Sequence, residues 1–100
     1  RYTQISSDER LKENISEMED VGVLIDNLRP VRFNWKENEN DPKPEGLMYG
    51  MIAQEVSSTA PEIALGSEET TMGIDSLSVI SILIKEVQEL RKRVTEIENI

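Results

Sequence analysis

The chain has 100 residues, 37% hydrophobic but only 4% aromatic, and its 20 acidic and 11 basic side chains give a formal net charge of -9. Phosphate binding needs clustered Lys and Arg, so this charge argues against nucleic acids and anionic membranes as partners. The sequence shows no apolar run of about 18 residues and no signal peptide, so we expect neither a membrane span nor a secretory route. Cysteine and histidine are absent, which excludes disulfides, Ser-His-Asp and Cys-His catalysis and the common zinc sites.

A domain of this length buries only a little over half of the surface that its unfolded chain exposes, so its stability alone is marginal. The composition predicts an aliphatic core with a few bulky anchors such as Phe33, Trp35 and Tyr49. Oligomerisation is the expected supplement to such a small core.

Residues 1–7 have mixed character and indicate an extended entry segment, and we expect an upstream continuation because the chain does not begin with methionine. Ser16 stands three positions before Glu19, a capping-box pattern that predicts a helix running to about Leu28. Pro30 then ends this helix.

Residues 31–35 alternate between apolar and polar side chains, which predicts a half-buried strand. Residues 38–46 contain two prolines and a glycine, so they predict an exposed loop. The acidic residues in and beside this loop lack the spacing of an EF-hand, so we expect a solvated loop and no metal site there; they are Glu37, Glu39, Asp41 and Glu45.

Residues 46–53 form a compact apolar run, in which Gly50 indicates a bulge or a close backbone approach. A short helix is predicted over 54–60. Two short strands, 63–65 and 70–74, are predicted on either side of a glycine-containing turn.

The last segment carries the strongest periodic signal in the chain. Asp75 or Ser76 can cap a helix along which apolar residues recur at alternating spacings of three and four. These heptad a and d positions are Ile80, Leu83, Val87, Leu90, Val94 and Ile97. The stripe can pack on its own domain or on another chain. Leu77, Ile82 and Ile84 widen the apolar face at its start, so we expect this half of the helix to pack on the globular part as well.

Charged residues flank the predicted seam. With Ile80 at a, Glu86 and Arg93 fall at g while Arg91 and Glu98 fall at e. Each g residue then faces an opposite charge five residues further along a neighbouring parallel helix, which favours self-association over packing within one chain. The heptads alone suggest a dimer, because β-branched residues occupy the a positions and Leu two of the three d positions.

Ser7 and Lys12 lie five residues apart, a spacing that a turn can close to form a Ser-Lys dyad. Taken alone this pattern is a weak signal, since a capping serine before a charged helix start looks the same. Lysine has an ordinary pKa of about 10.4 and acts as a base only where burial or nearby positive charge lowers that value. Arg10 and burial are candidate causes here, whereas Glu9 and Glu13 oppose the change.

The longer context of the dyad resembles a known family. The matching stretches are Ser7-Asp8 with Lys12-Glu13-Asn14, then Leu28-Arg29-Pro30-Val31-Arg32-Phe33-Asn34-Trp35, then Tyr49-Gly50-Met51-Ile52-Ala53-Gln54-Glu55-Val56, and the helix start from Asp75 to Leu90. They resemble the intramolecular chaperone auto-processing domain, the peptidase S74 family, of phage tail spikes and tail fibres. The fold expected is α+β, a small mixed domain with short strands and a long C-terminal helix in a parallel trimeric coiled coil. Residues 1–6 would end the upstream fibre segment and 7–100 form the chaperone, with 7–76 globular and 77–100 the coiled-coil helix.

The resemblance implies that three chains associate through the heptad seam, register the upstream fibre or spike segment of the same chain, and then release themselves by autoproteolysis. The cut would fall between Ser6 and Ser7, with Ser7 as nucleophile and Lys12 as the proton acceptor. Each chain would act once, on itself, without a cofactor. The family further implies assembly in the host cytoplasm and a parent protein in the virion tail. Two alternatives remain open: a trimerisation domain that does not cleave, and the related self-cleaving domain of a membrane-bound eukaryotic transcription factor.

Overall fold

The computed structural model describes residues 6–67 and 69–100, so the first five residues of the entry segment expected over 1–7 lie outside it. The elements in chain order are η1 (Glu9–Leu11), α1 (Gly22–Asp26), β1 (Val31–Phe33), β2 (Met48–Gly50), α2 (Ala53–Thr59), η2 (Pro61–Ile63), β3 (Ala64–Leu65), β4 (Gly73–Ile74) and α3 (Ser76–Glu98). This mixture of helices and short strands confirms the α+β class.

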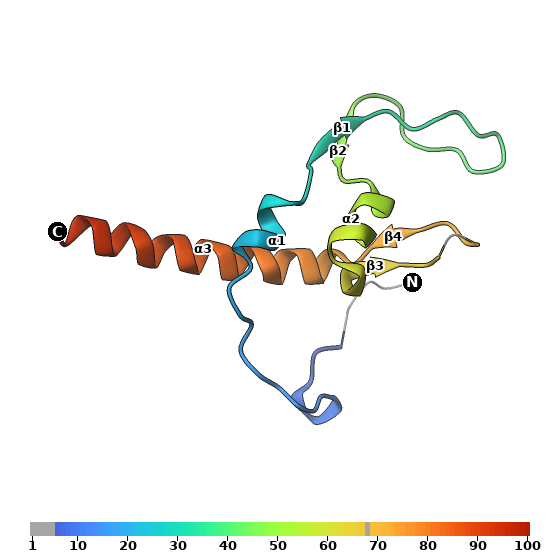
Figure 1. Cartoon of the computed structure of the whole chain (residues 1–100). Helices are drawn as coiled ribbons and strands as arrows, with labels where there is room; N and C mark the ends of the chain where they lie inside the picture. The colour runs from blue at the N-terminus through green and yellow to red at the C-terminus, as the bar shows by residue number, and fades with distance from the viewer. Residues whose placement is uncertain (1–5, 68) are drawn as a thin grey trace.

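Figure 1 shows a small body with three projections: the N-terminal arm (residues 6–20), the loop between β1 and β2, and the C-terminal half of α3. The radius of gyration is 17.3 Å, against about 13 Å for a compact domain of this length. A large part of the chain therefore lies outside the packed body.

The core of the body is aliphatic and small. Its buried residues come from the start of α1, from α2 and its C-terminal end, from η2 and from α3; they are Val21, Val56, Ala60, Ile63 and Ile82. The expected aromatic anchors contribute less than predicted, since Trp35 is 47% and Tyr49 75% exposed. For Tyr49 the prediction was wrong because this residue pairs with Arg32, at positions of the hairpin that stay exposed.

Two antiparallel hairpins complete the body. In the first, β1 pairs with β2 in a continuous register from Val31 opposite Gly50 to Phe33 opposite Met48. A Cβ atom added to Gly50 would lie 3.2 Å from Cε1 of Phe33, so the predicted close approach is confirmed and its reason is the Phe33 ring. The second hairpin pairs β3 with β4, shorter than the predicted strands.

The predicted helix from Ser16 was wrong in its first half, because α1 begins only at Gly22. Residues 11–20 are all exposed, and Oδ1 of Asp20, not Ser16, accepts a hydrogen bond from the Gly22 amide at 2.8 Å. This segment carries four acidic residues and one lysine and buries no face, so like charges such as Glu13 and Glu17 repel one another without compensation from packing.

The predicted C-terminal helix is present as α3, with Asp75 at its N-cap position. Oδ2 of Asp75 accepts a hydrogen bond from Oγ of Ser78 at 2.7 Å. As expected, the first half of α3 packs on the body, through buried Ile82. Leu77 and Ile84, which widen the apolar face, remain 44% and 54% exposed, so Ile82 is the one of these three residues that the body buries.

Candidate functional site

The structure brings Ser7 and Lys12 into contact. The Lys12 side chain donates a hydrogen bond from Nζ to Oγ of Ser7 at 2.6 Å. The helical turn η1 reverses the chain between them, closed by backbone hydrogen bonds from Leu11 N to Asp8 O (3.0 Å) and from Lys12 N to Glu9 O (3.1 Å). The five-residue spacing thus places an amine against a hydroxyl, while the catalytic role of the two residues stays a prediction.

Asp8 and Arg10 hold this turn together. The Asp8 carboxylate accepts hydrogen bonds from the Arg10 amide at 2.9 Å and from the Arg10 guanidinium, the shortest at 2.7 Å. The side-chain hydrogen bond from Arg10, followed by the backbone one, lowers the pKa of Asp8 below its usual value. Conversely, the hydrogen bond to Asp8 raises the pKa of Arg10.

Sequence reasoning treated Arg10 as a cation beside Lys12 and missed its pairing with Asp8. The signal that could have revealed the pair is an Asp at the N-cap of a turn with an Arg two residues on. The positive charge of Arg10 is directed at this carboxylate.

The dyad lies on the N-terminal arm, below α3 in Figure 1 and away from the core. Ser6, Ser7 and Lys12 are all exposed, so water reaches the dyad in the single chain. Further along the arm, Asn14 has a φ of 56°, a left-handed conformation that asparagine adopts more readily than most residues. The end of the arm approaches α3, where the side chains of Arg93 and Asp20 lie 3.8 Å apart.

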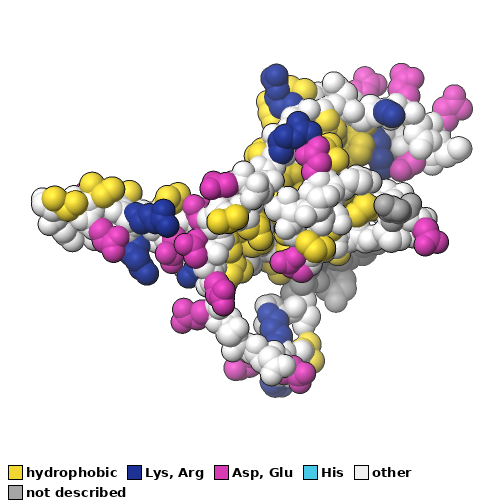
Figure 2. All heavy atoms as spheres, viewed as in Figure 1, with side chains coloured by type: hydrophobic (Ala, Val, Ile, Leu, Met, Phe, Trp, Pro, Cys, Tyr) yellow, Lys and Arg dark blue, Asp and Glu magenta, His cyan; other side chains and the backbone are white. Residues whose placement is uncertain are grey.

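The predicted heptad seam lies along one uncovered face of α3. Its six residues are between 48% and 67% exposed: Ile80, Leu83, Val87, Leu90, Val94 and Ile97. A shallow groove of about 280 Å³ follows this face beside Leu83 and Val87. Figure 2 shows hydrophobic side chains along the projecting half of the helix, with charged side chains beside them. A single chain thus leaves this stripe in water, and its role as a trimer interface stays a prediction.

Of the four residues in the predicted inter-chain ion pairs, Glu86 is half-buried and the other three are exposed. Arg93 approaches Asp20 of its own chain, a contact that sequence reasoning missed. Among the described residues, no salt bridge involves Glu86, Arg91 or Glu98.

Two of the family-like stretches meet in space. Leu28-to-Trp35 contains β1 and Tyr49-to-Val56 contains β2, and these strands pair. Next to them, the guanidinium of Arg29 donates two hydrogen bonds to the Glu55 carboxylate, at 3.0 and 2.5 Å. These hydrogen bonds lower the pKa of Glu55. Both stretches therefore build the body, and neither lies beside the dyad.

No group of three or more His, Cys, Asp or Glu side chains that could hold a metal ion occurs within residues 6–67 and 69–100. Nor does any helix in this part of the chain combine the length and apolar character that crossing a membrane requires.

No curated protein matches the chain. A family model does match, over residues 7–65, which is more than half of the chain; the family is Peptidase_S74, described as chaperone of endosialidase. The match begins at Ser7, the predicted nucleophile, and extends through the hairpin stretches to the end of β3. The chain therefore belongs to the peptidase S74 family, the chaperones of endosialidase, as its opening motif and its paired hairpin stretches predicted.

Proposed function

We propose that this domain is a C-terminal intramolecular chaperone that trimerises a phage tail fibre or spike in register and then cuts itself free between Ser6 and Ser7. The observation that carries the proposal is the 2.6 Å contact between Lys12 Nζ and Ser7 Oγ. Assembly would take place in the host cytoplasm, and the parent protein would reside in the virion tail.

The proposed cleavage is an acyl shift followed by hydrolysis. Oγ of Ser7 attacks the carbonyl carbon of Ser6 and gives up its proton to the neutral amine of Lys12. The Ser6–Ser7 amide bond breaks, its nitrogen takes a proton and becomes the new N-terminal amine, and Ser6 is left as an ester on Oγ. Water then hydrolyses the ester, which yields a Ser6 carboxylate and regenerates the Ser7 hydroxyl.

Exposure of the dyad suggests how assembly would control this reaction. A lysine in water is ordinarily charged near neutral pH and cannot accept a proton, whereas burial favours the neutral amine. In the single chain Ser7 and Lys12 are both exposed. On our proposal a neighbouring chain covers the arm, so that cleavage follows correct trimerisation.

The uncovered seam of α3 supports the assembly role. Six apolar residues at heptad spacing, each at least 48% exposed, form a stripe that a parallel coiled coil would bury. The charges at Glu86 and Arg91, and at Arg93 and Glu98, have the g-to-e spacing that matches opposite signs between parallel helices. We adopt the trimer because the family implies it.

Release of the chaperone would also lock the fibre kinetically, because the element that nucleates in-register assembly is then no longer available for the reverse path. Unfolding rates of cleaved and uncleaved fibre test this step, and equal rates would contradict it.

The test of self-cleavage uses the chain fused to its natural upstream segment, beside Ser7→Ala, Lys12→Ala and the matched control Ser16→Ala, whose serine lies on the same arm. Denaturing gels and intact mass should show a product that begins at Ser7 in the wild type and the control only. Hydroxylamine should capture the Ser6 ester as a hydroxamate. Cleavage that persists in Lys12→Ala, or occurs at another bond, would overturn the mechanism.

A trimerisation domain that does not cleave is the second candidate, and the exposure of Lys12 favours it because solvent stabilises the ammonium. The same gels separate the two functions. A wild-type fusion that forms trimers and stays intact would leave a chaperone without a protease.

A further inference from the structure

The first half of α3 has more apolar surface than its own chain covers. Ile82 is buried in the body, yet Leu77 and Ile84 on the same helix are about half exposed. These two residues lie outside the a and d positions, although Ile84 also borders the shallow groove on the seam. Exposing an isoleucine to water forgoes the stabilisation that its burial would bring, which suggests that another surface covers Ile84 in the assembled protein.

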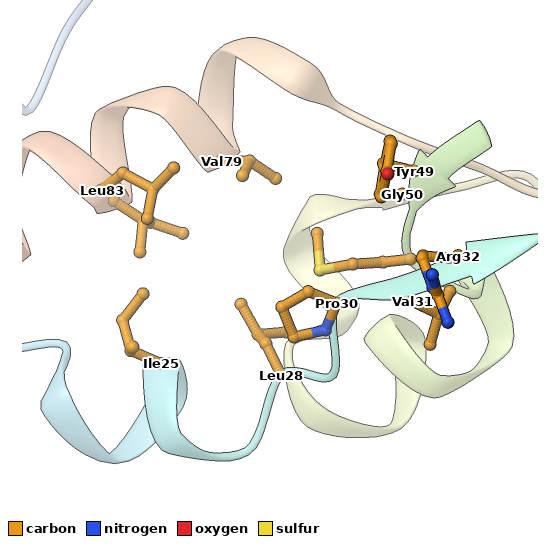
Figure 3. A pocket seen from close by; sticks show the side chains of 11 residues that line it. Ile25, Leu28, Pro30, Val31, Arg32, Tyr49, Gly50, Val79 and Leu83 are labelled. Carbon is orange, nitrogen blue, oxygen red and sulfur yellow. The ribbon is translucent and has the colours of Figure 1, made fainter. Parts of the chain in front are cut away.

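An apolar groove of about 610 Å³ opens beside this part of α3. Figure 3 shows Ile25 and Leu28 of the α1 region on one wall, facing Val79 and Leu83 of α3 across the gap. The β1–β2 hairpin closes one end, with Tyr49 at the rim. Leu83 also lines the shallow groove on the heptad seam, so the two apolar surfaces are continuous.

The heptad register determines what lies next to this groove in a parallel assembly. With Ile80 at a, Val79 falls at g and Ile84 at e. In a parallel assembly each g residue lies beside the e residue five positions further along the neighbouring helix. Just as Glu86 would lie beside Arg91 of the neighbouring chain, Val79 would lie beside Ile84 of that chain. The g and e positions are thus apolar beside the body and charged beyond it, which matches the apolar groove beside Val79 and the solvent around the projecting half.

We propose that the groove between α1 and α3 seats Ile84 of a second copy of this chain, so that each body clasps the helix of its neighbour. This inference rests on the parallel association proposed above. It adds a second contact beside the seam, and this contact would favour one register of the neighbouring helix over the others. A helix shifted by one heptad would present the guanidinium of Arg91 to the groove, and burying an unpaired charge there is unfavourable.

The absence of cysteine from the chain allows a direct test by cross-linking. Val79→Cys and Ile84→Cys are introduced together into the full chain, and the thiols are oxidised. Within one helix the two positions are separated by a rise of about 7.5 Å, beyond the roughly 7 Å Cα separation that a disulfide spans, so a disulfide must join different chains. Since each chain offers one thiol at each position, a closed trimer gives covalent trimers on a denaturing gel and a dimer gives covalent dimers.

The matched control combines Val79→Cys with Lys85→Cys, which places the second thiol one residue further along, at the f position on the side of the helix away from the seam. A second measurement compares Ile84→Ser with Val23→Ser, an exposed α1 residue outside the groove. We expect Ile84→Ser to weaken association by at least about tenfold in sedimentation equilibrium and Val23→Ser to leave it unchanged.

The outcomes separate this proposal from the proposed function. An oligomer that forms no more disulfide through positions 79 and 84 than the control would overturn the proposed binding of Ile84 in the groove. The groove would then be left to an upstream fibre segment or a small apolar ligand. A wild-type chain that stays monomeric would contradict the association itself.

Discussion

The body of the molecule and its projections differ in how far their apolar side chains are buried within one chain. In the body, Val56 and Ile63 are almost fully buried, and aliphatic residues from α2, η2 and α3 pack on one another. On the arm and the distal half of α3, apolar residues such as Leu11, Ile15 and Val94 remain exposed. The dyad and the distal part of the heptad seam lie on these projections, while the hairpin stretches of the family lie in the body. One chain is therefore enough to bury the core of the body, whereas the surfaces with a proposed function stay exposed and, on our proposal, are covered by a second chain.

The largest effect should come from a cavity in the core of the body, which lowers the free energy of unfolding. Ile63→Ala removes most of a buried side chain and should cost about 2–5 kcal/mol of unfolding free energy, a large part of what a small domain possesses. Leu65→Ala is the matched control, because that side chain is half exposed, and it should cost clearly less. Urea unfolding followed by circular dichroism measures both, and equal losses would contradict the position of the core.

Changes in the heptad seam should affect association and not the stability of the body. Leu90→Ser with Val94→Ser should leave the unfolding of the body unchanged but weaken association by tenfold or more, because each loses a burial of about 1.5–3 kcal/mol. Gln88→Ser, at a b position, is the control for helix content. Sedimentation equilibrium gives the readout, and a double variant that associates like the wild type would rule out this seam.

A charge exchange should have a smaller effect. Glu86→Arg sets two guanidinium groups against each other between parallel helices and should weaken association, while Glu86→Arg with Arg91→Glu should restore it. Exposed ion pairs contribute about 0.2–1 kcal/mol each, so the change should be a few-fold at low salt and shrink at high salt. If the double variant stays as weak as the single one, the helices do not pair in this parallel register.

The smallest effect concerns the turn that holds the dyad. The hydrogen bonds from Arg10 lower the pKa of Asp8, so their stabilisation is present above the ordinary value of about 3.9 and is lost as the pH falls through the lowered pKa. NMR titration should show Asp8 titrating below 3.9 in the wild type and nearer to it in Arg10→Ala. Arg29→Ala, a distant arginine of the body, serves as the control, and an Asp8 midpoint that ignores Arg10→Ala would contradict the ion pair.

Several elements followed from local pattern. The short helix after Ile52, the two hairpins and the long C-terminal helix stand where alternation, turn residues and heptad spacing predicted them. The helix predicted from Ser16 failed, because a capping pattern cannot stabilise an acidic segment that buries nothing. Tyr49 failed as a core anchor, since which face of a hairpin packs inward depends on contacts far along the chain.

The sequence by itself determined the family, the residues of the proposed dyad and the heptad stripe, because each of these depends on residue types at short, regular spacings. Only the tertiary structure decided that Arg10 pairs with Asp8, that Arg29 reaches Glu55 across 26 residues, and that Leu77 and Ile84 stay uncovered beside an apolar groove. Such facts depend on how distant segments pack and on which surfaces remain exposed once one small core is complete.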